Sequence, residues 1–269
     1  MKVLELFAGS QSISNQFRVN SHECFTVDNF VMFKGKESSE LVNKTSLNID
    51  IMNLTSDMIL EKFGQPDVIW ASVPCTKFSV AAIGKHWIKG TNDPKTEGAA
   101  EAVKLVEHTL KIIDELNPSL YYIENPRGKL RKIDCMQKLP RYTITYCQYG
   151  DTRMKPTDIW TNHPEPNFRP MCHNGDPCHI SAPRGSRTGT QGLANAVERS
   201  KIPEDFCKYI VEISEDIYNK DINDMNILEL EYLKELKIKE RNNCDADYDS
   251  EFVKQEIKEL LYFIDKLKV

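Results

Sequence analysis

The stretch Asp67-Val68-Ile69-Trp70-Ala71-Ser72-Val73-Pro74-Cys75-Thr76-Lys77-Phe78-Ser79 decides the fold that we expect for this chain. Its first five residues form a short apolar run that is typical of a buried strand. The rigid Pro74 and then Cys75 follow, which places the cysteine at the carboxyl edge of a sheet, where open α/β folds bind their ligands. A lone cysteine is more often a small buried hydrophobe than a nucleophile. The other motifs of the chain must therefore decide between these two roles.

Three further motifs stand around this cysteine. Residues 4–10 read as a strand running into a glycine turn, residues 121–126 as a strand ending in the carboxylate of Glu124, and residues 193–197 come late in the chain. Together with Pro74 to Ser79, and in this order, they resemble the motifs of the DNA cytosine-5 methyltransferase family: Phe-x-Gly, Pro-Cys-x-x-Phe-Ser, Glu-Asn and Gly-Asn-Ala-Val. The resemblance covers roughly the first 215 residues and is to a member with a short recognition region, of phage or bacterial type.

The chain of 269 residues is long enough for one large α/β domain or a large and a small one. We predict strands at 2–6, 23–28, 67–71, 120–123 and 141–147, and helices at 11–18, 54–63, 99–116 and from 203. Residues 76–98 are too polar and too often broken by glycine for a helix or strand, so we predict a long loop that closes over nucleic acid. Two charged helices, at 224–241 and 249–267, would form a hairpin for docking to a protein partner or for homodimerisation.

The resemblance implies a Rossmann-like, adenosyl-methionine-dependent methyltransferase sheet with a reduced recognition region. The expected divisions are a catalytic cofactor-binding domain at 1–161, a reduced target-recognition region at 162–193, a return segment at 194–218 that completes the catalytic domain, and a helical tail at 219–269.

Charge is distributed unevenly along the chain. Residues 216–269 carry 9 Lys+Arg against 14 Asp+Glu, whereas residues 127–201 carry 13 basic and 6 acidic side chains. The basic excess would meet a phosphate backbone, although a solvated basic face without a ligand explains it equally well.

The first strand begins directly after Met1, and no run approaches the ~20 apolar residues of a membrane span. We therefore expect a cytoplasmic protein whose eight cysteines are reduced.

The glycine turn and an acidic residue after it indicate a cofactor site. Amides at a helix start, approached closely at Gly9, suit a polar ligand edge. Asp28 follows this turn by about 20 residues, a spacing at which a carboxylate meets ribose hydroxyls, unless it only caps its strand. The resemblance implies that S-adenosyl-methionine contacts Phe7, Ala8, Gly9, Ser10, Asp28, Asp50, Pro74, Asn195 and Val197. The chain departs from the family at Gln11 and Ala194, where the family has glycine.

The resemblance also implies the chemistry. Cys75 would attack carbon 6 of a flipped cytosine while Glu124 hydrogen-bonds ring nitrogen 3 and the amino group, and Arg153 would hold the base carbonyl. Contacts to DNA would come from Lys77, Ser79, Lys85, Lys89 and Lys155. Three alternatives stay open: a tRNA cytosine methyltransferase, since RNA is not excluded, a non-catalytic binder of nucleic acid or cofactor, and an enzyme acting on free nucleotides.

Residues 172–179 combine two Cys-His pairs in eight residues. Such ligands suit zinc, but adjacent side chains point in different directions and the spacing is not that of a usual zinc ribbon. The sequence therefore favours no metal. If zinc binds, its ligands would be Cys172, Cys178 and His179, with Cys135 or Cys147 completing the site.

Overall fold

The computed structural model of this chain describes residues 1–29, 44–180, 196–243 and 258. The chain divides into two compact units, Met1–Ser214 and Glu215–Val269. In the part of the chain that the structure describes, no helix combines the length and the apolar character that crossing a bilayer requires.

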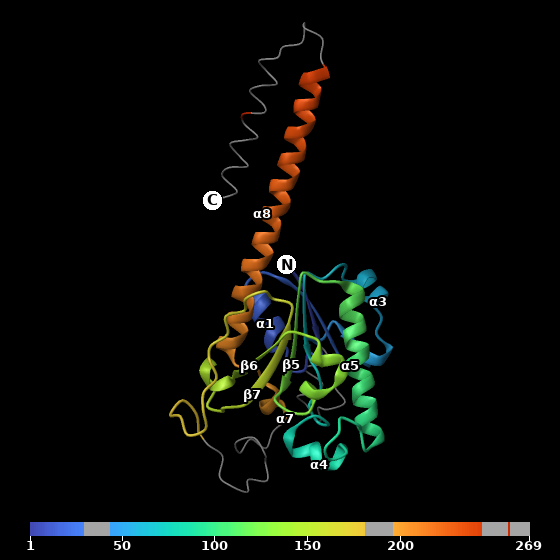
Figure 1. Cartoon of the computed structure of the whole chain (residues 1–269), viewed down its shortest axis with the longest axis vertical. Coiled ribbons are helices and arrows are strands. Elements are labelled where there is room, and N and C mark those ends of the chain that lie inside the picture. Colours follow the sequence, from blue (N-terminus) through green and yellow to red (C-terminus); the bar gives the residue numbers. More distant parts are fainter. Residues whose placement is uncertain (30–43, 181–195, 244–257, 259–269) are drawn as a thin grey trace. The chain divides into compact units, whose positions relative to one another are not determined.

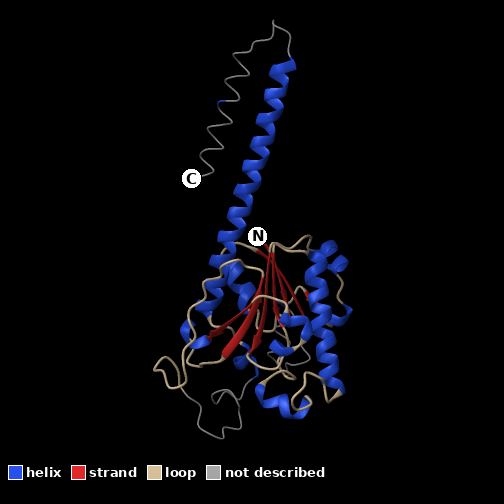
Figure 2. Cartoon of the chain, in the orientation of Figure 1, coloured by secondary structure: helices blue, strands red, loops and turns tan. Residues whose placement is uncertain are grey.

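A seven-stranded sheet with the order β3-β2-β1-β4-β5-β7-β6 forms the centre of the first unit (Figures 1 and 2). The strands are β1 Lys2–Leu6, β2 Glu23–Asp28, β3 Leu47–Asn48, β4 Val68–Ser72, β5 Leu120–Pro126, β6 Arg141–Thr145 and β7 Pro156–Thr161. The first five of these in the sheet are parallel, whereas β7 pairs antiparallel with both β5 and β6. The order 3-2-1-4-5 is that of a doubly wound nucleotide-binding sheet, so the predicted Rossmann-like α/β class is confirmed.

Helices cover both faces of this sheet (Figure 1). Leu4 and Leu6 belong to the core on the side of α5, whereas Phe206, at the start of α8, stacks edge-on against Trp70 on the other face. A strand buried on both faces explains the continuous apolar run that predicted β4. The helices are α1 Ser12–Val19, α3 Ser56–Lys62, α4 Ile83–His86, α5 Glu97–Leu116, α6 Asp134–Gln137, α7 Ala196–Ser200 and α8 Glu204–Asn243; 3₁₀ helices are η1 Ile51–Asn53, η2 Val80–Ala82, η3 Leu130–Lys132 and η4 Tyr146–Tyr149.

Strand β7 was not predicted from the sequence. It begins at a proline and carries Asp158 in its middle, and both residue types are rare inside strands. Asp158 is nevertheless fully buried, because Arg131 forms a bidentate ion pair with it and the Thr143 hydroxyl donates to it at 2.8 Å. A partner from outside the strand therefore makes this carboxylate tolerable in the sheet.

Two other predictions need correction. The segment 76–98 is not an unstructured loop: it contains η2 and α4, and Trp87 is buried with its indole N–H donating to the Lys77 carbonyl at 2.7 Å. The predicted break between a helix from 203 and a helix at 224 is also wrong, since α8 runs from Glu204 to Asn243. No glycine or proline interrupts that stretch, so nothing local ends the helix. The rest of the predicted hairpin, residues 244–257 and 259–269, lies outside the described residues.

Candidate active site

Cys75 and Glu124 leave the same edge of the sheet from adjacent parallel strands. Ser72 of β4 pairs with Glu124 of β5, so Cys75 lies three residues beyond the strand position beside the carboxyl group. The Asn125 amide donates to the Val73 carbonyl at 2.7 Å and ties the end of β5 to the cysteine loop. The loop then turns, because the Phe78 and Ser79 amides donate to the Cys75 carbonyl at 3.0 and 2.9 Å.

Glu124 is buried, with 6% of its surface exposed. The Tyr146 hydroxyl donates to its Oε1 at 3.0 Å, which fixes the orientation of the carboxyl group. Burial raises the pKa of Glu124 against the opposing effects of Lys155 and of the Tyr146 hydrogen bond. The carboxyl group therefore keeps its proton to a higher pH than an exposed glutamate does, which suits a hydrogen-bond donor to a base.

Lys155 completes this group of titratable side chains. Its Nζ lies 4.4 Å from the centre of the Tyr146 ring and donates to the Arg199 carbonyl at 3.3 Å. Burial raises the pKa of Cys75, and Glu124 raises it further, whereas Lys155 lowers it. Burial also lowers the pKa of Lys155, and the nearby Glu124 carboxyl group partly offsets this decrease. A thiol, a carboxyl group and an ammonium group thus influence one another's ionisation at one point of the sheet edge.

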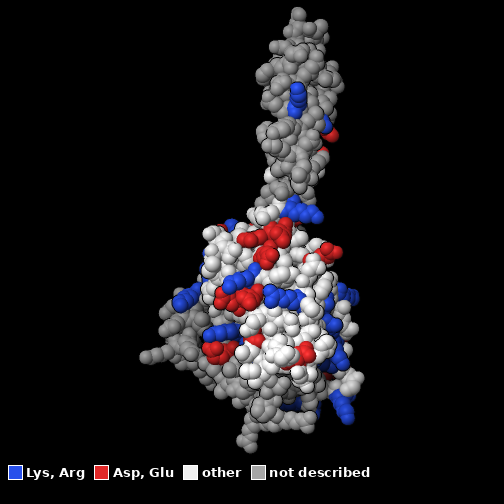
Figure 3. Space-filling view, turned by 90° about the vertical axis from the view of Figure 1, so that its left-hand side faces the viewer, with Lys and Arg blue, Asp and Glu red and all other residues white. Residues whose placement is uncertain are grey.

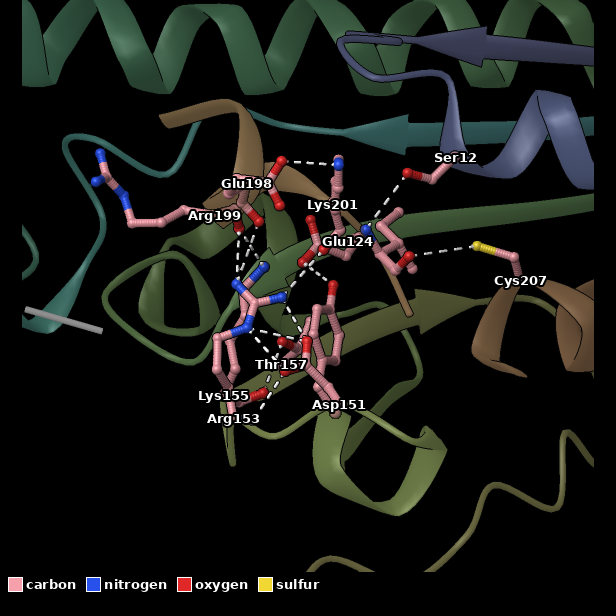
Figure 4. A network of polar contacts seen from close by, with 12 residues as sticks. Ser12, Glu124, Asp151, Arg153, Lys155, Thr157, Glu198, Arg199, Lys201 and Cys207 are labelled. Atoms are coloured by element: carbon pink, nitrogen blue, oxygen red, sulfur yellow. Dashed lines mark hydrogen bonds and ion pairs between the residues drawn. The ribbon is translucent and has the colours of Figure 1, made fainter. Parts of the chain in front are cut away.

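Arg153 is held by several protein partners (Figure 4). Its guanidinium forms a bidentate ion pair with Asp151 and also reaches the carbonyls of Glu198, Arg199 and Lys201 at 3.4 to 3.5 Å. Only 6% of the residue is exposed. The structure thus gives Arg153 the role of joining the Asp151 turn to the segment before α8, and Lys155 is the basic side chain that faces Glu124.

The first turn after β1 closes around the carboxylate of Asp28. The Gly9 amide donates to Asp28 Oδ2 at 2.8 Å, and the Ala8 amide donates to the Val27 carbonyl at 3.1 Å. Phe7, Gly9 and Gln11 all have positive φ, at 56°, 47° and 55°. This backbone brings the glycine against the end of β2 in the manner of a nucleotide-binding turn.

Gln11 adopts a left-handed conformation at the position where the family has a second glycine. Its side chain is buried and hydrogen-bonded: Nε2 donates to Thr45 Oγ1 at 3.2 Å, and Oε1 accepts from Arg18 Nη1 at 3.0 Å. These bonds offset the cost of about 1 kcal/mol that a non-glycine residue incurs in this conformation. The departure from the family is thus accommodated locally.

The other predicted cofactor residues have varied surroundings. Asp50 caps η1, since Oδ1 accepts from the Met52 amide at 2.9 Å, and Oδ2 accepts from the Asn29 amide group at 3.1 Å. Ser10 hydrogen-bonds Ser12 at 2.8 Å, and Phe7 and Pro74 are half-buried. Val197 lies in α7, whereas Asn195 lies outside the described residues. The segment before α8 contacts the start of α1, because the Ile202 amide donates to Ser12 Oγ at 3.4 Å.

Of the side chains predicted to contact nucleic acid, Lys85 and Lys89 are exposed, and Lys77 and Ser79 are half-buried. Ser79 also forms an isolated β-bridge with Gly128. Lys155 is set back among the active-site groups rather than on an open surface. On the face of the molecule shown in Figure 3, basic and acidic side chains are interspersed among the described residues.

Sequence reasoning missed two residues of this site. Tyr146 appeared only as part of an alternating strand, and Asn125 only as part of a motif, although one orients Glu124 and the other holds the cysteine loop. The polar residue directly after Glu124 was the available signal for Asn125. Nothing in the local sequence distinguished Tyr146 from neighbouring Tyr142 and Tyr149.

Comparison with known proteins identifies a family that this chain matches. Residues 1–137 match the family described as C-5 cytosine-specific DNA methylase. A probable DNA (cytosine-5)-methyltransferase of Frog virus 3 (isolate Goorha) is 27% identical over 170 residues, which are 60% of this chain and 71% of the viral protein. Among solved structures, DNMT2 of Spodoptera frugiperda (18% identity, TM-score 0.41) and the S. pombe Dnmt2 methyltransferase (13%, 0.39) each match 60% of this chain. The matches span 49% and 48% of those two chains, about half their length.

Proposed function

This chain belongs to the C-5 cytosine-specific DNA methylase family, and we propose that it transfers a methyl group from S-adenosyl-methionine to carbon 5 of cytosine in DNA. The observation that carries the proposal is the meeting of Cys75 and Glu124 at the carboxyl edge of β4 and β5, with Lys155 beside them. This combination supplies a nucleophile, a proton-holding carboxyl group and a positive charge in one place.

The first turn fits the cofactor. An amide-lined turn at Gly9 packs against the carboxylate of Asp28, and the adenosyl group would be held by this turn together with Asp50. When bound, S-adenosyl-methionine supplies an electrophilic methyl group. The residues of the chain supply the remainder of the chemistry.

Cys75 loses its proton to water, and its thiolate adds to carbon 6 of the cytosine, which breaks the 5,6 double bond and places an electron pair at carbon 5. Glu124 donates a hydrogen bond to ring nitrogen 3 and so stabilises the charge that develops in the ring. Lys155 favours the thiolate form of Cys75. After carbon 5 gains the methyl group, its proton leaves to water, the electron pair of that carbon–hydrogen bond re-forms the 5,6 double bond, and the sulfur departs as a thiolate.

Tyr146 and Asn125 are positioning residues in this scheme. Tyr146 holds the Glu124 carboxyl group through its hydroxyl, and Asn125 holds the loop that presents Cys75. Because the thiolate approaches the face of the ring, the base must leave the stack of the duplex. Lys85 and Lys89 are placed on the exposed part of the segment after Cys75, where they can contact phosphates.

Trapping with 5-fluorocytosine tests the proposal, since fluorine at carbon 5 cannot leave as a proton and the cysteine adduct persists. The purified full-length protein is incubated with S-adenosyl-methionine and duplex DNA or a transcribed tRNA carrying the analogue. We expect a covalent adduct with DNA that resists denaturation, requires cofactor and disappears in Cys75→Ala. Cys135→Ala, another half-buried thiol, is the matched control and should form the adduct normally.

Each other outcome rejects part of the proposal. An adduct with tRNA alone would reject DNA as the substrate and retain the chemistry. Formation of the adduct by Cys75→Ala would reject this nucleophile. A folded protein that forms no adduct with either polymer would favour a non-catalytic binder.

A further inference from the structure

Three thiols and one imidazole meet at a point away from Cys75 and Glu124. Cys147 comes from η4, whereas Cys172, Cys178 and His179 come from the segment that follows β7. Their four ligand atoms all lie within 4.8 Å of one another. Cys147 and Cys172 are buried, with 8% and 4% of their surfaces exposed.

The separations of these atoms are close to those of a tetrahedral zinc site. Zinc bonds of about 2.3 Å to sulfur and about 2.0 Å to nitrogen separate two sulfurs by about 3.8 Å and sulfur from nitrogen by about 3.5 Å. His179 Nδ1 lies 3.6 Å from both Cys172 Sγ and Cys178 Sγ, and Cys178 Sγ lies 3.6 Å from Cys147 Sγ. The Cys147–Cys172 pair is closer, at 2.9 Å, which is still longer than the 2.03–2.05 Å of a disulfide bond.

The neighbouring groups support these side chains as ligands. The Gln148 side-chain amide donates to Cys178 Sγ at 3.7 Å, and the Cys172 backbone amide donates to Thr145 Oγ1 at 3.0 Å. Hydrogen bonds of this kind orient metal ligands.

Two residues that the sequence also offered are not ligands here. The His173 side chain is 90% exposed and lies 3.8 Å from Asp176, and Cys135 is in α6, outside the cluster. The sequence argument against a metal assumed that the two neighbouring side chains of each Cys-His pair point in different directions. The structure shows that only the first pair does, because both Cys178 and His179 reach the cluster.

We propose that Cys147, Cys172, Cys178 and His179 bind one structural zinc ion. Three cysteines and one histidine form a closed ligand set of the structural type, with no position left for water. On binding, the thiols release their protons to solvent and coordinate as thiolates.

The site would fasten an irregular segment to the catalytic unit. Residues 162–180 contain no helix or strand, yet the Arg169 guanidinium donates to the Gln148 carbonyl at 2.7 Å and the Ile180 amide to the Thr152 carbonyl at 2.8 Å. These bonds and the metal would hold the segment on η4. Cys147 directly follows Tyr146, whose hydroxyl contacts Glu124, so the zinc ion would also stiffen the support of the proposed active site.

Metal analysis of the purified full-length protein, with any affinity tag removed, tests this site independently of methyl transfer. We expect about one zinc per chain by mass spectrometry, falling at least tenfold in Cys172→Ser, Cys178→Ser and His179→Ala. His173→Ala, from the same segment, and Cys135→Ser are matched controls that should retain the metal. Because loss of a ligand can also impair folding, the wild-type protein is in addition exchanged with cobalt, which should give thiolate charge-transfer and tetrahedral d–d absorption bands.

Three results would overturn the proposal. The first is a folded wild-type protein that neither contains zinc nor takes up cobalt with the tetrahedral spectrum. The second is a Cys147–Cys172 disulfide in protein purified under reducing conditions. The third is zinc that persists at one per chain in the ligand variants.

Discussion

Replacing Gly128 with alanine should displace the loop that carries Cys75. Ser79 and Gly128 form a β-bridge, and the Lys129 amide donates to the Phe78 carbonyl at 2.7 Å, so the two segments are in close backbone contact. A Cβ at residue 128 would come under 3.0 Å from the Phe78 oxygen and lie 3.2 Å from the Phe78 carbonyl carbon. Backbone atoms cannot rotate away as a flexible side chain can, so the segments must separate by roughly 1 Å to restore ordinary contact.

The size of the effect follows from that displacement. Overpacking of this kind costs about 1–3 kcal/mol in the free energy of unfolding. Phe78 and Ser79 both donate to the Cys75 carbonyl, so the displacement reaches the thiol, and an error of about 1 Å in a reacting group can lower a rate about 100-fold. Urea denaturation measures the first quantity, and the rate of 5-fluorocytosine adduct formation measures the second.

Gly84→Ala is the matched control. A Cβ at Gly84 in α4 meets nothing within 4 Å, and alanine is the better helix former by up to about 1 kcal/mol. This variant should therefore be as stable as the wild type or slightly more so, with an unchanged rate. If Gly128→Ala matched the wild type within about 0.5 kcal/mol and formed the adduct at the same rate, the close approach at Phe78 would not control this loop.

Three further substitutions probe the buried charges. Burial raises the pKa of Glu5 from 4.5 to about 7, so the folded state holds this proton more tightly than the unfolded chain, and the loss of folding stability from ionising Glu5 grows between pH 4.5 and pH 7. Glu5→Gln should therefore be more stable than the wild type by up to about 3 kcal/mol at pH 8 and by almost nothing near pH 4.5. Equal differences in urea denaturation at both pH values would contradict this. Tyr146→Phe removes a hydrogen bond that lowers the pKa of Glu124, so kcat should fall about threefold to tenfold, and the alkaline decline in rate should move to higher pH; a pH profile that does not move would reject the contact. Lys155→Gln removes a charge that lowers the pKa of Cys75, so the pH midpoint for alkylation of that thiol, followed by peptide mass spectrometry, should rise, and an unchanged midpoint would place the ammonium group too far away.

The tertiary structure corrected the sequence analysis where a residue's partner is distant in the chain. Aspartate is rare inside strands, so Asp158 did not predict one, but in the structure Arg131, 27 residues earlier in the chain, forms an ion pair with this carboxylate. The resemblance implied that Arg153 holds the base carbonyl and that Lys155 contacts DNA, whereas in the structure Asp151 holds Arg153 and Lys155 lies beside Glu124.

The metal cluster shows the same division. Cys172, Cys178 and His179 were recognisable as ligands from their types and spacing, but the sequence offered Cys135 and Cys147 equally as the fourth. The choice depends on how η4 packs against the segment after β7, which only the folded chain decides.

The sequence by itself determined the strands β1, β2, β4 and β5, the helix α5 and the position of Cys75 at a sheet edge, because apolar patterning and a proline act on neighbouring residues. The tertiary structure alone decided which groups face Glu124, which cysteine joins the cluster, and that β7 enters the sheet. These outcomes depend on side chains brought together from distant segments, whose burial and pairing cannot be assigned until the chain is folded.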